Sequence, residues 1–116
     1  MKLDWDLFRN ILLFVEDNSS PNRWLNLEDF LQICPNKDKV LEHLLLLKKD
    51  AFIEGEASYA DNECAEFIVT GLTMKSHDYL NTIRNDTIWN QIKDYLSNHA
   101  ISISFTAIEL ALKSIS

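Results

Sequence analysis

VLEHLLLLKKDAFIEGEASYADNECAEFIVTGLT, residues 40–73, is the stretch that decides the fold. It begins with apolar residues at helical spacing, and the basic pair Lys48-Lys49 stands where such a helix ends. Two short β-like runs follow, Ala51–Ala57 and Cys64–Thr70, and a polar acidic loop separates them. Gly71-Leu72-Thr73 then opens another helix. This order, after a helical N-terminal region, predicts a winged helix-turn-helix.

The residues before this stretch predict helices as well. Leu3–Val15 carries an apolar stripe with a period near 3.6 residues, which is typical of a core-facing helix. Residues 17–22 are polar and contain a proline, so they form a loop. Leu25–Ile33 predicts a short helix that begins near Asn26. Asn36 is a good N-cap for the next helix, which extends to about residue 50.

Three more helices are expected after the hairpin. Thr73 can cap a helix that runs to about Asn85, and Asp86 can cap the next, which Asn98 closes. A short extended or hooked segment at residues 101–104 precedes the last helix. The inward-facing side chains of the last two helices are expected to be Ile88, Trp89, Ile92, Leu96, Phe105, Ile108, Leu112 and Ile115.

No repeat, low-complexity tract or linker divides the chain, so residues 1–116 are expected to form one domain. The predicted fold is mainly α with a small antiparallel β-hairpin (α+β). It is a winged helix-turn-helix over residues 1–72 with a C-terminal helical extension over 73–116. The predicted core joins Leu7, Ile11 and Phe14 to Val40, Leu44 and Leu47, and Phe67 or Ile68 from the hairpin closes it.

Charge is distributed unevenly along the chain. Hydrophobic residues make up 47% and charged residues 25%, an ordinary globular composition, and the net charge is −7. Residues 1–50 sum to −2 and residues 73–116 to zero, whereas residues 51–72 carry five acids and no lysine or arginine. The predicted wing is therefore acidic. Because phosphate contacts supply most non-specific DNA affinity, such a wing would repel the DNA backbone.

The sequence argues against several classes of protein. No apolar run reaches the ~20 residues of a membrane span, and two acids in Met1–Asp6 argue against a signal peptide, so we expect a cytoplasmic protein without membrane contact. Cys34 and Cys64 stand alone and are expected to be buried or idle thiols. Only two glycines are present, too few for a nucleotide-binding loop, and the three histidines lack metal-ligand spacing. We therefore expect no cofactor, no metal and no enzymatic activity.

The helix over residues 37–50 is the predicted recognition helix. With Leu44 turned to the core, 100° per residue places Val40, Leu41, Leu47 and Ala51 on the same side. Lys39, Glu42, Leu46 and Lys49 then lie outward, flanked by Asp38 and His43. The candidate DNA-binding residues are Asn36, Lys37, Lys39, His43 and Lys49. A face that reads bases usually presents Arg, Asn or Gln, so a solvated helix face is at least as good an interpretation.

The block Gly71-Leu72-Thr73, His77-Asp78-Tyr79-Leu80, Ile83-Arg84 and Trp89 resembles an uncharacterised family of small bacterial and phage or prophage proteins with the pattern GLT…GHDFL…IR…W. The resemblance implies a winged-helix-like fold and a phage or prophage context. Two departures stand out: Ser76 replaces a glycine, and Asp50-Ala51-Phe52-Ile53 replaces a Gly-Leu-Ile entry to the hairpin. Within the block, His77, Asp78, Arg84 and Trp89 are expected to form a structural or interaction patch.

Two functional hypotheses follow. The first is a winged-helix regulator that binds DNA as a homodimer through its C-terminal helices. The second is an acidic protein-interaction module, a phage accessory or anti-defence protein that binds a host protein. Its candidate interaction residues are Leu46, Glu54, Glu56, Asp61 and Glu63. The order of elements and the residues Asn36, Lys37, Lys39 and Lys49 support the first hypothesis, for which fold analogy by itself is a weak argument. The net charge, the acidic wing and the exposed Leu46 support the second.

Overall fold

Five α-helices, one 3₁₀ helix and three strands make up the described part of the chain. The structure is a computed structural model that describes residues 4–101 and 105–115. The elements follow in the order α1 (Trp5–Asn18), β1 (Leu25–Asn26), η1 (Leu27–Gln32), α2 (Lys37–Lys49), β2 (Ile53–Ala60), β3 (Glu63–Leu72), α3 (Met74–Ile83), α4 (Asp86–Asn98) and α5 (Phe105–Ile115). The prediction of a mainly helical α+β fold with a small antiparallel sheet is confirmed.

The three strands form one antiparallel sheet in the order β1-β3-β2. A two-residue turn joins β2 to β3, and both of its residues, Asp61 (φ 53°) and Asn62 (φ 67°), have left-handed backbone. Asp and Asn tolerate this conformation better than most residues, and it matches the twist of a tight hairpin. The predicted hairpin with a polar tip is confirmed.

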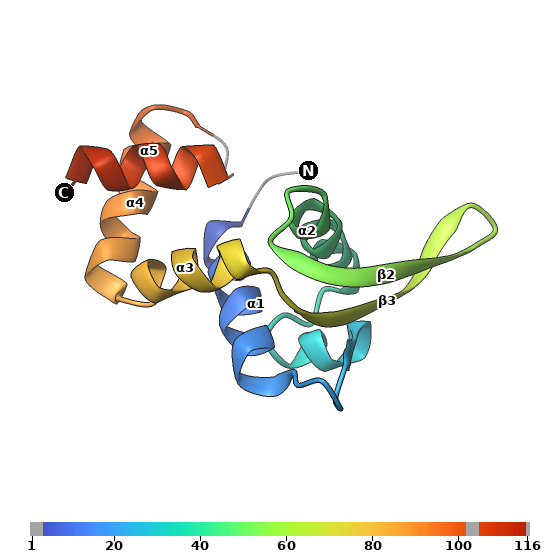
Figure 1. The fold of residues 1–116 in the computed structure, drawn as a ribbon. Coiled ribbons are helices and arrows are strands. Elements are labelled where there is room, and N and C mark those ends of the chain that lie inside the picture. Colours follow the sequence, from blue (N-terminus) through green and yellow to red (C-terminus); the bar gives the residue numbers. More distant parts are fainter. Residues whose placement is uncertain (1–3, 102–104, 116) are drawn as a thin grey trace.

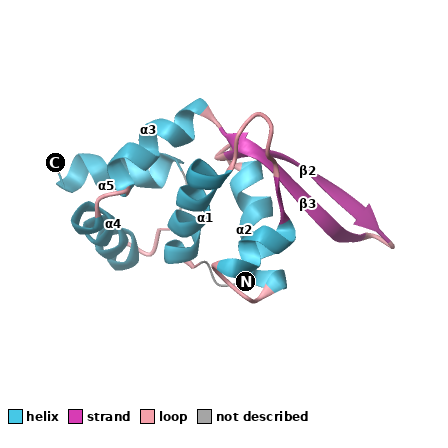
Figure 2. Cartoon of the chain, turned by 90° about the horizontal axis from the view of Figure 1, so that it is seen from below, coloured by secondary structure: helices cyan, strands magenta, loops and turns pink. Residues whose placement is uncertain are grey.

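The hairpin projects from the helical body. Figure 1 shows β2 and β3 extending away from α1 and α2, while α4 and α5 lie at the opposite end of the molecule. Figure 2 shows the same arrangement from below, with α1 between the hairpin side and the α3–α5 side. The long dimension of 44 Å, against 30 and 22 Å, reflects this extended shape.

The core joins α1 to α2 and the sheet, as predicted. Leu7 and Ile11 of α1 and Val40, Leu44 and Leu47 of α2 are buried. Phe67 on β3 is fully buried whereas its neighbour Ile68 is half-buried, so Phe67 closes the core. Phe14 is only partly buried and packs on the ring of Phe30 at a centroid distance of 5.3 Å.

Several local predictions were wrong. The segment expected to be helical from Leu25 begins instead as strand β1, because Leu25 and Asn26 pair with Val69 and Ile68, and only Leu27–Gln32 is helical, as a 3₁₀ helix. Asn85, not Asp86, caps α4 by accepting from the N–H of Ile88.

Other predicted positions on the last helices are only partly described. Ile108 is buried as expected, and so are Trp89, Ile92 and Leu96, whereas Ile88 is partly buried. The side chains of Phe105, Leu112 and Ile115, and the segment 102–104, lie outside the described residues.

None of the helices in the described ranges is long and apolar enough to cross a membrane.

Candidate functional site

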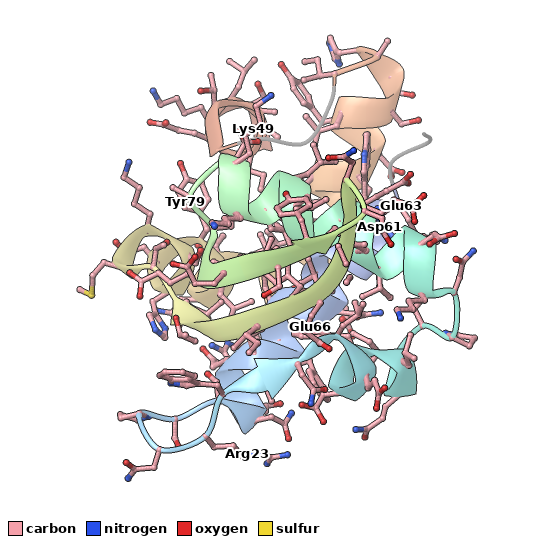
Figure 3. The ribbon with its side chains drawn as sticks, turned by 90° about the vertical axis from the view of Figure 1, so that its right-hand side faces the viewer. Arg23, Lys49, Asp61, Glu63, Glu66 and Tyr79 are labelled. Atoms are coloured by element: carbon pink, nitrogen blue, oxygen red, sulfur yellow. The ribbon has the colours of Figure 1, made fainter. Side chains whose placement is uncertain are left out.

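The β2–β3 hairpin carries five acids, and we call it the acidic arm: Glu54, Glu56, Asp61, Glu63 and Glu66. The first four are exposed, and none of them has an ion pair or side-chain hydrogen bond within the described parts of the chain. Glu66 is half-buried and accepts a 3.4 Å hydrogen bond from the N–H of Leu27. Figure 3 shows Asp61 and Glu63 together at the tip of the hairpin, with Glu66 nearer the body. The arm thus presents four carboxylates that have no cationic partner among the described residues.

Strand alternation separates the two faces of the arm. Gly55 and Ala57 are half-buried toward the body, whereas Glu54, Glu56 and Ser58 are exposed on the opposite face. A Cβ at Gly55 would press against the carbonyl oxygen of Ile68, so a larger residue does not fit there unless the strands separate. The outward face of β2 is consequently polar and acidic along its length.

One aromatic side chain that the sequence analysis did not select lies on the arm. The Tyr59 side chain is 64% exposed and stands opposite Cys64 near the hairpin tip. Exposed tyrosines in such positions are frequent binding hot spots because they combine apolar area with a hydroxyl group. The only sequence signal for it is an aromatic residue inside an acidic, polar loop.

On α2, two of the predicted DNA contacts, Lys39 and His43, are engaged by other residues of the protein. Nζ of Lys39 pairs with Asp4 Oδ2 at 2.7 Å, and this hydrogen bond lowers the pKa of the Asp4 carboxyl and raises the pKa of Lys39. His43, predicted to flank the outer face, is instead 2% exposed. Its Nδ1–H donates to the Lys39 carbonyl at 2.8 Å, and its Nε2 accepts from the N–H of Asp4 at 3.0 Å. His43 therefore holds the start of α1 against α2.

The remaining polar residues of α2 form a mixed face. The Asn36 side chain accepts from the N–H of Lys39 and so serves as the predicted N-cap. Lys37, Lys48 and Lys49 are exposed, but Asp38 and Glu42 are exposed among them. Leu46 is 37% exposed, and Ala51, expected on the core side, is also exposed. Alternating signs on this face weaken its attraction for phosphate.

The family-motif residues do not form one surface patch. Arg84 pairs with Glu16 on α1 at 2.8 Å, and His77 Nδ1 lies 4.0 Å from the same carboxylate. Asp78 is exposed and is not part of this cluster. Trp89 is buried, stacks with Phe8 at a centroid distance of 6.2 Å, and donates from its indole nitrogen to Asp6. Most of the motif thus attaches α3 and α4 to α1.

A second polar cluster lies in a cleft between α1, α2 and α4, and no local pattern indicated it. The carboxylate of Asp6 accepts from Lys93 at 2.7 Å, and this hydrogen bond, followed by that of Trp89, lowers the pKa of Asp6. Its partners are more than 80 residues away in the sequence, which is why spacing alone missed it. The cleft is lined by Asp4, Trp5, Asp6, Lys39, Lys93, Asp94 and Ser97. Since most of its charges neutralise one another, we interpret it as structural.

No set of three or more metal-ligating side chains occurs in residues 4–101 or 105–115. Cys34 and Cys64 are half-buried free thiols.

Comparison with known proteins places this chain in a family. The family described as "Hypothetical protein (DUF2513)" matches residues 2–102. A Haemophilus influenzae protein named "Uncharacterized protein" is 33% identical over 115 residues, which cover 99% of this chain and 95% of its own length. No solved structure matches the chain.

Proposed function

We propose that this chain, which belongs to the DUF2513 family, is a winged-helix protein whose acidic arm binds a basic surface of a partner protein. The observation that carries the proposal is the projecting hairpin with four exposed carboxylates that have no cationic partner among the described residues. Carboxylates on a projecting element attract a positively charged partner over distances comparable to the Debye length, about 8–10 Å at physiological salt.

The order of elements supports the winged-helix interpretation. Helix α2 follows a short helix, precedes the hairpin, and has the three-stranded sheet in the order β1-β3-β2 beside it. In proteins of this architecture the equivalent of α2 and the hairpin are the surfaces that meet a ligand. Here they differ in charge: α2 is mixed, and the hairpin is uniformly acidic. The more strongly charged surface is therefore the better candidate for partner binding.

The test compares two charge-neutralised variants of the full chain. The first is Glu54→Gln/Glu56→Gln/Glu63→Gln, and the second, its matched control, is Lys37→Gln/Lys48→Gln/Lys49→Gln. Lys39 is left in place because it pairs with Asp4. Affinity capture from a bacterial extract should retain a basic protein on the wild type and on the lysine variant but not on the glutamate variant. Retention that is indifferent to the glutamate changes contradicts the proposal.

DNA binding is the second candidate, and the exposed Lys37, Lys48 and Lys49 on α2 favour it. Mixed-sequence duplex DNA titrated over a salt series separates the two candidates. If these three lysines neutralise three phosphates, log K should fall with log salt at a slope of about −2.7. The lysine variant should then lose binding, and the glutamate variant should bind more tightly because repulsion is removed.

The proposal also covers the origin of the protein and the place where it acts. The motif resemblance suggests a phage or prophage context, and a cytoplasmic site of action without a catalytic role is proposed on the composition and motifs of the sequence. Dimerisation through α4 and α5 stays a prediction; Leu110 on α5 is exposed and offers apolar area for such a contact.

A further inference from the structure

We infer that the partner is held by strand addition, with an extended segment rich in lysine or arginine pairing along the free outer edge of β2. The inference rests on the proposed function and names the manner in which the acidic arm captures its partner. Three features of the hairpin support it: an unpaired edge, a regular strand at that edge, and charge of one sign.

The first feature is the unpaired edge. In the order β1-β3-β2, strand β2 has a sheet neighbour on one side only among the residues that the structure describes. Residues Gly55–Ala60 make no backbone hydrogen bond outside the β2–β3 pairing within the described parts of the chain. An edge strand of this kind presents a row of N–H and C=O groups that can pair with another extended chain. Figure 1 shows that this part of the hairpin extends beyond the helices.

The second feature is the regularity of β2. The sheet register shifts at Glu54/Gly55 and at Ser58/Tyr59, and in both places the extra residue, Thr70 or Ala65, belongs to β3. Bulges, charged side chains and proline on an edge strand protect it from pairing with other chains. Strand β2 has neither a bulge nor a proline, and its two charges, Glu54 and Glu56, are both negative, so they oppose an acidic or identical strand but not a basic one. Residues 55–60 are therefore a template that no bulge or proline interrupts.

The third feature is charge, which determines what kind of segment can pair with β2. Glu54, Glu56 and Ser58 project from one face of β2, so every second side chain of an added strand would lie beside them on that face. Lysine or arginine at those positions makes opposite-charge cross-strand pairs. A second copy of this chain paired through β2 would bring like charges together, which is unfavourable. The structure thus favours a basic segment over self-association.

A cleft lies beside the strand pair at the base of the hairpin. It is lined by Lys48 and Ala51 from the end of α2, by residues of β2, and by Thr70 and Thr73. The aromatic ring of Tyr59 lies toward the other end of the strand and is exposed. An added strand would therefore extend from the base of the hairpin toward the exposed tyrosine.

The experiment uses synthetic eight-residue peptides with lysine at alternate positions and valine or threonine between them. Two further peptides carry N-methyl groups, one on the odd-numbered amides and the other on the even-numbered amides. Because only alternate amides of an added strand face β2, one methylated peptide should bind at least about tenfold more weakly, and the other should bind like the parent. Binding to the full chain is followed by amide chemical shifts, which should move in residues 53–60.

The same titrations distinguish the possible failures. If both methylated peptides bind like the parent and the Glu54→Gln/Glu56→Gln variant binds none of them, the arm attracts basic chains without strand pairing. The inference then falls and the proposed function stands. Shifts confined to α2 or to the outer helices, or no binding of the parent peptide, also overturn strand addition. Shifts in residues 53–60 that depend on protein concentration without peptide would replace it with self-pairing.

Discussion

The guanidinium of Arg9 on α1 donates a 2.8 Å hydrogen bond to the backbone carbonyl of Ile83, at the C-terminal end of α3. The same side chain reaches the carbonyl of Arg84 at 2.6 Å and the carboxylate of Asp86 at 2.7 Å. It therefore satisfies carbonyls that the end of a helix leaves without intrahelical partners, and it also fixes the first residue of α4. One side chain on α1 positions the junction on which α4 depends.

Replacing Arg9 by alanine should lower the free energy of unfolding by about 2–3 kcal/mol, since hydrogen bonds to a charged group are lost from a largely buried side chain. Arg9→Lys should recover only part of this, because an ammonium group cannot reproduce the guanidinium fork. Urea unfolding measures both. Arg23→Ala, at an exposed loop position, is the control. A loss for Arg9→Ala no larger than that of the control would contradict the role assigned here.

Two helices are followed by an alanine whose backbone is in the left-handed conformation. These alanines are Ala51 (φ 62°) after α2 and Ala100 (φ 51°) after α4. In each case the next N–H reaches back to the helix, from Phe52 to Leu47 and from Ile101 to Leu96, as in a Schellman motif. Alanine is strained in this conformation and glycine is not. Ala51→Gly and Ala100→Gly should each stabilise the chain by up to about 1 kcal/mol, additively, in thermal or urea unfolding. Destabilisation by either change would refute this.

The sequence predicted the helices and the hairpin well because their signals are local. The caps Asn36 and Thr73 and the apolar spacing of α1 and α2 each depend on residues within a few turns. Strand β1 was missed because its two residues become a strand only by pairing with Val69 and Ile68, more than 40 positions away.

The same dependence on distant residues explains which site residues could be predicted from the sequence. Counting charges along the sequence was enough to locate the acidic arm, but not to find which lysines are free. Lys39 is engaged by Asp4, and His43 turns inward because the N–H of Asp4 gives its imidazole a buried partner. Ser76, which stands where the motif has glycine, is fully buried, and its hydroxyl bonds the carbonyl of Phe52. These contacts depend on tertiary packing, which helical periodicity does not report.

The two glycines should respond in opposite ways to a methyl group. A Cβ at Gly55 would collide with the Ile68 carbonyl and lie 3.1 Å from the Phe67 ring, whereas a Cβ at Gly71 would meet nothing within 4 Å. Gly55→Ala should therefore destabilise the chain by about 1–3 kcal/mol, since the strand pair must separate. Gly71→Ala should be within about 0.5 kcal/mol of wild type. Equal effects in urea unfolding would show that the strands are not held as closely as described.

The Asp4–Lys39 pair should make stability fall in acid. Because the hydrogen bond from Lys39 lowers the pKa of Asp4 in the folded chain, the unfolded chain binds a proton more readily. The contribution is present above about pH 4 and is lost as pH falls through the lowered pKa. Asp4→Asn should flatten this acid limb of the stability profile. Asp61→Asn, at the exposed turn, is the matched control, and an unchanged slope in the Asp4 variant would contradict the pairing.

Leu44 and Leu46 on α2 separate stability from binding, because the first is fully buried and the second is 37% exposed. Leu44→Ala should cost about 2–5 kcal/mol of unfolding free energy, while Leu46→Ala should cost less than about 1 kcal/mol. If the partner contacts α2 as well as the arm, Leu46→Ala should weaken capture without lowering stability, since apolar anchors contribute to affinity at an interface. Partner capture and urea unfolding are measured on the same two variants. A large stability loss for Leu46→Ala would instead place this side chain in the core and remove it from the candidate surface.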